Sequence, residues 1–535
     1  MEYVPINSVW EITMACNMRC KHCGSKCTDR QPEELTGKEA LQLCDDLAEL
    51  GLKIVTLSGG EPLTRPDWPS IAKRLSGHGI AVTMISNGWL VDHSVIDKAL
   101  DSGLDSIGIS LDGVEKTHDS IRKKGAFARV LRALEIMKKR DFPSSIITTV
   151  MKQNLPELPA IKKVLEEKGV KQWQLQIGMP MGNLGENRDN VISPHQLNDI
   201  IDFAYTVMKE GKIRAALADN VGYYTNKSVE IAQAVCGPNT VWSGCSAGKS
   251  VIGVLHDGRI VGCTSLRDKQ YVEGSIRETP LREIWTRPGA FAWNRDLNQE
   301  KLTGFCKKCR YGERCLGGCS TLKRFTGETL SENNYCAYKL SVEELIPKID
   351  RIEDAETLVA RAEKSIALEL YEIAEMCLSR AIKKSSVDVD LLNLLGYVCF
   401  QMKDYKQSLK LNKDALDIQP DHPYSLKGLG LCLSRLGKRE EGIASLRKSV
   451  ALTDESFMDP YHDLAVVLHE AGQLYEAIDV LEQGSRKSGS FAQQTKEMYQ
   501  SFLREKNGKE VITDDWKTGF VPGKAGEIPA HLPTM

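Results

Sequence analysis

The chain has 535 residues, 41% of them hydrophobic, and its 70 basic and 72 acidic side chains leave a formal net charge of −2. This length predicts about two to four packed units, and the balanced charge excludes a general attraction to nucleic acid. No segment approaches the roughly 20 apolar residues of a membrane span, and the N-terminal residues do not resemble a signal peptide. We therefore expect a cytoplasmic protein without nucleic-acid or membrane partners, in which most of the 16 cysteines bind iron or zinc.

Short apolar segments alternate with amphipathic segments through the first two hundred residues. The strand patterns lie at 9–14, 54–58, 80–86, 106–112, 145–151 and 172–177. Because each is followed by a helical pattern, six strand-helix units predict a parallel sheet covered by helices, in the form of an incomplete barrel. Active sites of such folds lie at the C-terminal ends of the strands.

The loop after the first predicted strand holds Cys16, Cys20 and Cys23 in a CxxxCxxC spacing, with Cys27 as one further thiol. Three thiolates on so short a loop can close on one iron-sulfur cube, and since a four-iron cluster takes four ligands, one iron stays open. Zinc is the alternative, although structural zinc sites usually combine two CxxC knuckles. The spacing resembles the signature of the radical S-adenosylmethionine (AdoMet) superfamily, with His22 where that family usually has an aromatic residue.

This resemblance implies an AdoMet site at the ends of the following strands. The sequence GGEP after the second strand resembles the motif that holds the AdoMet amino group, because glycine lets the main chain approach a ligand closely. Single turn motifs of this kind are common, but their order behind CxxxCxxC favours the functional interpretation. No catalytic acid or base is predicted. The residues that the resemblance assigns to AdoMet are Gly59, Gly60, Glu61, Pro62, Ser86, Asn87, Ser110 and Arg122.

A second cysteine-rich segment resembles the SPASM extension, which carries auxiliary iron-sulfur clusters in maturases of peptides and proteins. By that resemblance one cluster is held by a CxxCx5C run and one later cysteine. These four ligands are Cys306, Cys309, Cys315 and Cys336. Zinc binding is again the alternative.

The second auxiliary cluster lacks a ligand. The resemblance assigns Cys245, Cys263 and Cys319 to it, whereas fully ligated relatives supply one more cysteine shortly after the first. Cys236 is the candidate for the missing ligand; otherwise the cluster has an open iron or a two-iron form. Sulfatase maturases carry an aspartate directly after the Cys263 position, where this chain has Thr264, and this difference disfavours sulfatase maturation.

From about residue 355 the pattern changes to paired helices with a repeat. Tyr371, Tyr405 and Arg439 stand 34 residues apart, and the repeat resembles the tetratricopeptide repeat, whose stacked helix pairs form a concave groove. Two interpretations stay open, a helical support for the enzyme and a groove that docks a peptide. The apolar repeat positions taken by Cys377, Cys399 and Cys432 are expected to belong to the core.

The expected organisation combines an α/β unit, a cysteine-rich unit and an all-α array. Its parts are a radical-AdoMet partial (βα)6 barrel at 1–235, a SPASM domain at 236–345, tetratricopeptide repeats at 355–488 and a loose tail at 505–535.

The resemblance implies reductive cleavage of AdoMet to methionine and a 5′-deoxyadenosyl radical, which abstracts hydrogen from carbon of a ribosomally made precursor peptide. The product would be a cross-link, a thioether or a backbone excision. The implied cofactors are a [4Fe-4S] cluster with an open iron, AdoMet and two auxiliary iron-sulfur clusters. Expected partners are the peptide, an electron donor such as flavodoxin or ferredoxin, and a separate leader-peptide-binding protein.

Two alternatives come from other functional classes. One is a non-enzymatic iron-sulfur carrier or scaffold whose repeats bind clients, although such a carrier has no use for three ligands together with GGEP. The other is a radical enzyme that acts on a small-molecule cofactor precursor, which has little use for a repeat array.

Overall fold

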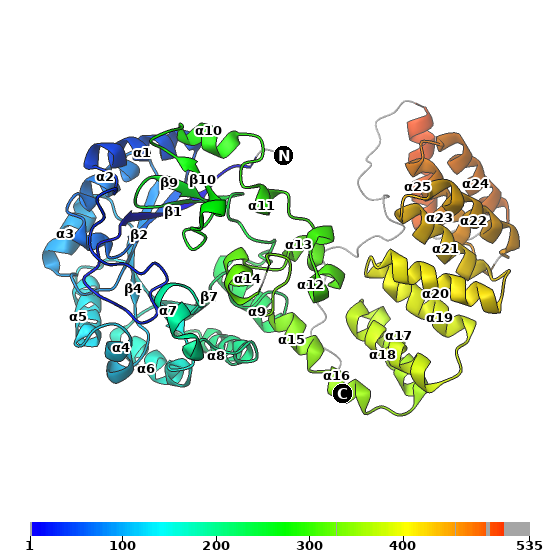
Figure 1. The fold of residues 1–535 in the computed structure, drawn as a ribbon, viewed down its shortest axis with the longest axis horizontal. Coiled ribbons are helices and arrows are strands. Elements are labelled where there is room, and N and C mark those ends of the chain that lie inside the picture. Colours follow the sequence, from blue (N-terminus) through cyan, green and yellow to red (C-terminus); the bar gives the residue numbers. More distant parts are fainter. Residues whose placement is uncertain (1–2, 328, 455, 488–492, 508–535) are drawn as a thin grey trace. The chain divides into compact units, whose positions relative to one another are not determined.

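The computed structural model describes residues 3–327, 329–454, 456–487 and 493–507 (Figure 1). The chain divides into two compact units, the first formed by Met1–Lys307 with Tyr311–Ser341 and the second by Lys308–Arg310 with Val342–Met535. No helix within the described residues is long and apolar enough to cross a membrane.

The first unit is built on one ten-stranded sheet of order β10-β9-β8-β1-β2-β3-β4-β5-β6-β7 (Figure 1). Strands β1 to β7 run parallel to their neighbours, and the first six coincide with the six predicted strands. The strands are β1 (Asn7–Thr13), β2 (Ile54–Gly59), β3 (Ala81–Ser86), β4 (Ser106–Ser110), β5 (Ser144–Val150), β6 (Gln172–Ile177), β7 (Arg214–Leu217), β8 (Val251–Val254), β9 (Arg259–Val261) and β10 (Val272–Ser275).

Helices that pack on the sheet begin and end where the sequence supplies caps. The first begins after Thr36, whose side chain and that of Glu39 form a capping box, and it ends at Gly51 with a left-handed φ of 96°. The helices between the parallel strands are α1 (Gly37–Leu50), α2 (Trp68–Gly77), α3 (His93–Asp101), α4 (Glu115–Ile121), α5 (Ala126–Lys139), α6 (Leu158–Lys168), α7 (Gly182–Glu186) and α8 (Gln196–Glu210).

The sheet continues past β1 into the cysteine-rich segment. Strand β8 pairs parallel with β1, so that Trp10 lies opposite Val254, and β9 then returns antiparallel to β8. The turn between β8 and β9 closes at Gly258, which has a φ of 85°. Because β9 ends two residues before Cys263, this hairpin fixes that cysteine beside the sheet that carries the first cysteine loop.

The helices between β7 and the repeat array are mostly short. They are α9 (Asn226–Cys236), α10 (Leu281–Thr286), α11 (Ala292–Arg295), α12 (Gly304–Lys308), α13 (Gly312–Cys315), α14 (Ser320–Thr326), α15 (Ala337–Glu343) and α16 (Ile346–Asp350).

The second unit is an array of paired helices, and three of its helices begin at the repeat positions Tyr371, Tyr405 and Arg439. The first helices of successive pairs pack on one another, α19 on α21 and α21 on α23. The three cysteines expected in the core, Cys377, Cys399 and Cys432, are buried. Of the expected tail, residues 505 and 506 end α25, and 508–535 lie outside the described residues. The helices are α17 (Ala355–Ala367), α18 (Tyr371–Lys384), α19 (Val389–Gln401), α20 (Tyr405–Ile418), α21 (Pro423–Arg435), α22 (Arg439–Leu452), α23 (Asp459–Glu470), α24 (Leu474–Lys487) and α25 (Gln493–Lys506).

Candidate functional site

The loop with the first three cysteines leaves β1 and is closed at its base by one carboxylate. Glu34 is 4% exposed and accepts hydrogen bonds from the Thr13 hydroxyl, at 3.0 and 3.1 Å, and from the Met14 amide, at 2.7 Å. Within the loop, the Cys16 amide donates to the Thr28 carbonyl at 2.9 Å. These bonds fix where the loop starts and ends at the C-terminal edge of the sheet.

Segments that follow other strands hold the middle of this loop. After β6, the backbone amide of Asn183 donates to the Cys23 carbonyl at 2.9 Å and its side-chain amide donates to the Cys20 carbonyl at 2.8 Å. After β3, the Asn87 side chain donates to Asn17 at 2.7 Å. The loop is therefore held by the parts of the barrel where such folds carry their active sites.

The structure brings Cys16, Cys20 and Cys23 together. Burial raises the pKa of Cys20 to about 11, and the charges of Cys16 and Cys23 act in the same direction. Cys27 is buried against them, and its hydrogen bond lowers the pKa of Cys23.

This arrangement fits a four-iron cluster. Nowhere in the described part of the chain do three His, Cys, Asp or Glu side chains converge as the ligands of a single ion do. The thiolates of a four-iron cluster bind different irons and need no such convergence.

The two glycines after β2 are required by packing. A Cβ atom on Gly59 would lie 2.2 Å from the Thr13 carbonyl oxygen, and one on Gly60 would lie 2.2 Å from that of Ala15. Gly59 also has a φ of 134°. Both residues are glycine because the end of β2 packs directly against the start of the cysteine loop. The sequence pattern had suggested instead that they let the main chain approach a ligand. Pro62 begins the short 3-10 turn that follows.

Glu61 is fully buried and joins β2 to β3. Its carboxylate accepts hydrogen bonds from the Ser86 hydroxyl at 2.8 Å, the Asn87 amide at 2.7 Å and the Leu63 amide at 3.2 Å. Burial raises the pKa of Glu61 to about 7. The side chains of Ser86 and Asn87, predicted to meet AdoMet, are thus bonded to Glu61 and Asn17.

Arg122 forms an ion pair that the sequence did not predict. Its Nε donates to Oδ2 of Asp112 at 2.5 Å, and His22 Nε2 lies 3.1 Å from the same oxygen. Burial acts to raise the pKa of Asp112, but Arg122 and His22 lower it well below the usual range. Arg122 also lowers the pKa of Cys20, so the guanidinium lies beside the cysteine loop. The signal in the sequence was an aspartate two residues after Ser110, which ends the apolar strand β4.

One arginine links the first cysteine loop to the SPASM-like segment. Arg267 donates to the Glu11 carboxylate at 2.8 Å, the Ser25 hydroxyl at 2.7 Å and the Thr264 carbonyl at 2.8 Å. Thr264 follows Cys263 directly, so this arginine fixes the distance between the two groups of cysteines.

The structure also brings Cys245, Cys263 and Cys319 near one another. Burial raises the pKa of Cys319, and the charges of Cys245 and Cys263 add to this effect. The Thr321 hydroxyl lies 3.6 Å from the Cys263 sulfur. Cys236, the candidate fourth ligand, is exposed at the end of α9.

Three of the four cysteines assigned to the other auxiliary cluster are close together in the first unit. Burial raises the pKa of Cys315, and the charges of Cys336 and Cys306 contribute. Cys309 is buried and belongs to the segment Lys308–Arg310 of the second unit.

Lys323 lies among cysteines of both auxiliary groups, and sequence reasoning missed it because a lysine in the helical segment STLKRFT reads as solvent-exposed. Its side chain is fully buried and donates to the Leu316 carbonyl at 2.7 Å. Burial lowers the pKa of Lys323, while Cys245, Cys306, Cys315 and Cys319 act to raise it.

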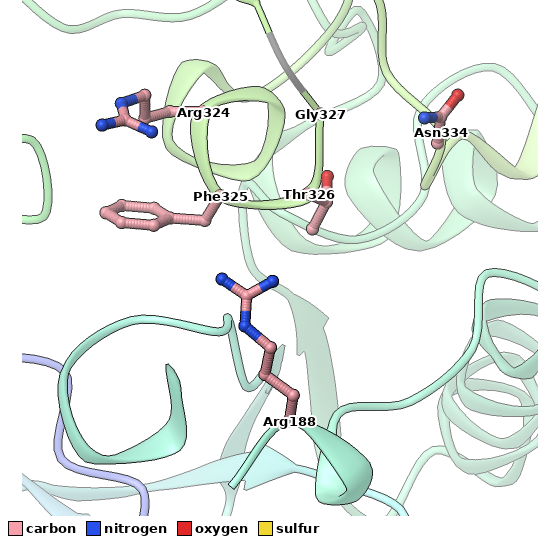
Figure 2. A pocket seen from close by; sticks show the side chains of 6 residues that line it. All are labelled: Arg188, Arg324, Phe325, Thr326, Gly327 and Asn334. Atoms are coloured by element: carbon pink, nitrogen blue, oxygen red, sulfur yellow. The ribbon is translucent and has the colours of Figure 1, made fainter. Parts of the chain in front are cut away.

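A pocket of about 520 Å³ opens between the segment after β6 and helix α14. Figure 2 shows Arg188 directed from below towards the part of α14 that carries Phe325 and Thr326, with Arg324 above the Phe325 ring. Arg324 also donates to Asp268 at 2.9 Å. Two guanidinium groups beside an aromatic ring suit a ligand that carries carboxylates. The lining residues are Arg188, Arg324, Phe325, Thr326, Gly327 and Asn334.

Comparison with known proteins agrees with this division of the chain. Residues 10–165 match the model of the radical SAM superfamily, residues 245–310 match that of an iron-sulfur cluster-binding domain, and residues 389–422 match that of the tetratricopeptide repeat. The AdoMet-dependent heme synthase of Methanosarcina barkeri is 34% identical over 349 residues, which are 63% of this chain and 98% of that protein. The mycofactocin maturase of Mycolicibacterium smegmatis is 27% identical over 60% of this chain and 80% of its own length.

Solved structures have the same fold. That of anSMEcpe with bound AdoMet aligns with a TM-score of 0.52 at 19% identity, covering 64% of this chain and 98% of its own. That of SuiB from Streptococcus suis, bound to the precursor peptide SuiA, aligns with a TM-score of 0.50 at 14% identity, covering 62% of this chain and 75% of its own.

A partial barrel that carries three cysteines on the loop after its first strand, followed by further cysteine groups, defines a radical AdoMet enzyme. The chain belongs to the radical SAM superfamily and carries a SPASM domain and tetratricopeptide repeats. This membership sets aside the interpretation as a non-enzymatic carrier. It implies [4Fe-4S] clusters and AdoMet as cofactors, while the number of auxiliary clusters stays a prediction.

Proposed function

We propose that this radical SAM enzyme modifies a ribosomally made precursor peptide, and the repeat array is the observation that carries the proposal. When bound, the first cluster and AdoMet supply a 5′-deoxyadenosyl radical that removes a hydrogen atom from substrate carbon. Cys16, Cys20 and Cys23 would hold this cluster. Glu61 and the Asp112–Arg122 pair position the loop and the strand ends around it.

The first helices of the repeats present groups that can hold a peptide. Tyr424 stacks on Phe457 with ring centroids 5.7 Å apart. Between α21 and α23, the ammonium of Lys427 lies 3.4 Å from the Asp459 carboxylate and 3.6 Å from that of Asp463. Aromatic rings and fixed charges along one face suit an extended chain with mixed side chains. Docking there would raise the concentration of the peptide near the barrel.

The peptide proposal also has support from similar proteins. One relative is named a maturase, and one structural neighbour was solved with a precursor peptide. The products considered for this chain stay a cross-link, a thioether or a backbone excision, and a separate leader-binding protein and an electron donor such as flavodoxin or ferredoxin stay expected partners.

A second candidate function is the modification of a carboxylate-bearing tetrapyrrole. The relative with 34% identity is named a heme synthase, and the pocket with Arg188 and Arg324 supplies two guanidinium groups. Such groups could pair with two carboxylates of one flat ligand. The repeat array has no evident role in this alternative.

The test compares the two substrates on the full chain. Anaerobically reconstituted, dithionite-reduced protein is incubated with AdoMet and either a candidate precursor peptide, sought among the short reading frames beside its gene, or an iron tetrapyrrole that carries propionates. We expect the peptide to increase 5′-deoxyadenosine formation and to change in mass. The variant with Cys16→Ala, Cys20→Ala and Cys23→Ala is the control and should form no 5′-deoxyadenosine. Stimulation by the tetrapyrrole alone would overturn the peptide proposal in favour of the second candidate.

A further inference from the structure

The auxiliary group of Cys245, Cys263 and Cys319 has three thiols where a four-iron cluster needs four ligands. The candidate cysteine, Cys236, is exposed at a helix end. Another side chain of a type that can bind iron is that of Asp219, which lies in the segment after strand β7.

One buried tyrosine fixes Asp219 next to Cys319. The Tyr223 hydroxyl donates to the Asp219 carbonyl at 2.9 Å and accepts a hydrogen bond from the Cys319 amide at 3.0 Å. Tyr223 is 6% exposed and has a φ of 86°, a backbone conformation that a residue with a side chain adopts only when its surroundings hold it there. Its carbonyl accepts a hydrogen bond from Ser228. The backbones of Asp219 and Cys319 are thus held on either side of a single oxygen atom.

The Asp219 carboxylate has no hydrogen bond or ion pair with any described residue, and its charge acts on the thiol of Cys319. The Asp219 side chain is exposed at this position in the segment after β7. A carboxylate without a protein partner, on a backbone that Tyr223 holds next to that of Cys319, is free to bind a cation.

We propose that Asp219 supplies the fourth ligand of the auxiliary cluster held by Cys245, Cys263 and Cys319. The inference rests on the proposed assignment of that cluster, but it does not depend on the identity of the substrate. An ionised carboxylate replaces a thiolate here, so the total charge of the ligand set is unchanged. A carboxylate is a harder donor than a thiolate, and the iron that it binds is therefore the one most able to exchange its ligand for a substrate group.

The experiment reads iron and spectra and does not need substrate. In full-length protein with Cys16, Cys20 and Cys23 replaced by Ala, only the auxiliary clusters remain, and iron content, electron paramagnetic resonance and Mössbauer spectra are recorded. We expect Asp219→Asn to change the signal of one auxiliary cluster and to lower iron by one to four atoms per chain. Asp219→Cys should restore full iron with an altered spectrum, because a thiolate then replaces the carboxylate. Cys236→Ala is the matched control and should leave iron and spectra unchanged.

Several results would overturn the proposal, and each has a distinct meaning. Iron loss in Cys236→Ala with an unchanged Asp219→Asn would assign the ligand to Cys236. Unchanged spectra in both variants would indicate an open iron. Zinc in place of iron in the unsubstituted chain would overturn the cluster assignment itself, whereas a failure of the peptide proposal would leave all these spectra unaffected. Retention of the second auxiliary signal in Asp219→Asn checks that the variant is folded.

Discussion

Gly60 determines how closely β2 can approach the cysteine loop. Its missing Cβ leaves room for the Ala15 carbonyl oxygen, which would otherwise lie at 2.2 Å. The same contact places the Glu61 amide within 2.8 Å of that carbonyl oxygen. A methyl group at residue 60 would have to push the loop away from the strand, because the three nearest atoms, of Met14 and Ala15, all belong to the backbone.

We expect Gly60→Ala to destabilise the protein by about 2–4 kcal/mol and to remove most of the iron held by Cys16, Cys20 and Cys23. Gly77→Ala is the matched control, since a Cβ atom on Gly77 meets nothing within 4 Å. Iron analysis and the yield of 5′-deoxyadenosine measure the effect. Equal iron in the two variants would contradict this explanation of the motif.

Lys323 acts on both auxiliary cysteine groups because its ammonium is buried among them. A cation favours the reduced, more negative state of a nearby cluster. Lys323→Met should therefore lower the reduction potentials of both auxiliary clusters by roughly 50–100 mV, equivalent to about 1–2 kcal/mol of charge interaction at an effective dielectric of ~20.

Lys249 provides the control for that prediction, because Cys245 is the cysteine that acts on its pKa. Lys249→Met should shift one potential and leave the other in place, as measured by redox titration with electron paramagnetic resonance. Unchanged potentials in Lys323→Met would show that the lysine serves only to bond the Leu316 carbonyl.

The cysteine motifs could be recognised from their spacing in the sequence. The residues that hold the cysteine loops in place could not. The cysteines of CxxxCxxC and CxxCx5CxxxC stand close in sequence, so their spacing is itself a signal. Asp112 and Tyr223 act through contacts with residues that come from other segments of the chain. Such contacts depend on how strands and loops are placed in space, and no local pattern records them.

At the scale of the elements, the buried neutral side chain of His118 joins helix α4 to the segment that follows β4. His118 is fully buried, and its Nδ1 accepts a hydrogen bond from the Asp112 amide at 3.1 Å. Burial lowers the pKa of His118 from 6.5 to about 4, with a further contribution from Arg122. The unfolded chain therefore binds more protons than the folded chain between these pH values, and stability from this group is lost as the pH falls from 6.5 to 4.

We expect His118→Gln, which keeps a hydrogen-bond acceptor, to remove this pH dependence. The free energy of unfolding of the unsubstituted chain relative to the variant should fall by up to about 3 kcal/mol between pH 6.5 and 4. The two proteins must be compared because the pKa of Glu61 is raised to about 7. Protonation of Glu61 therefore stabilises the folded chain as the pH falls over the same range. Urea unfolding followed by near-ultraviolet circular dichroism measures the difference, and parallel curves for the two proteins would refute the argument.

The first six strands were predictable from apolar segments that alternate with helical patterns, and the structure confirms them. Strands β7, β8, β9 and β10 are only three or four residues long, too short for a pattern to stand out. The pairing of β8 with β1 joins residues more than 240 positions apart. That pairing depends on tertiary packing, so the sequence alone predicted a six-stranded sheet where there are ten strands.

At the scale of the whole molecule, the repeat unit includes a segment from the SPASM-like region. Within the second unit, the Arg310 amide donates to the Glu372 carboxylate at 2.8 Å, and Lys308 pairs with Asp404 at 2.8 Å. Cys309, a predicted cluster ligand, stands between these two residues. Removing residues 355–535 would therefore take away the partners of this segment and disturb cluster binding, so truncation is an unsuitable test of peptide docking.

Substitutions on the first helices of the repeats test docking without this difficulty. Tyr424→Ala removes the stacked ring beside Phe457, and we expect it to weaken the binding of a labelled precursor peptide about tenfold, a loss of about 1.4 kcal/mol. Lys410→Ala, at an exposed position of helix α20, is the control and should bind the peptide as the unsubstituted chain does. Both variants should keep their iron and the AdoMet cleavage seen without peptide, because both residues belong to helices of the repeat array. Equal peptide affinity in all three proteins would leave the array as a support and remove the docking hypothesis.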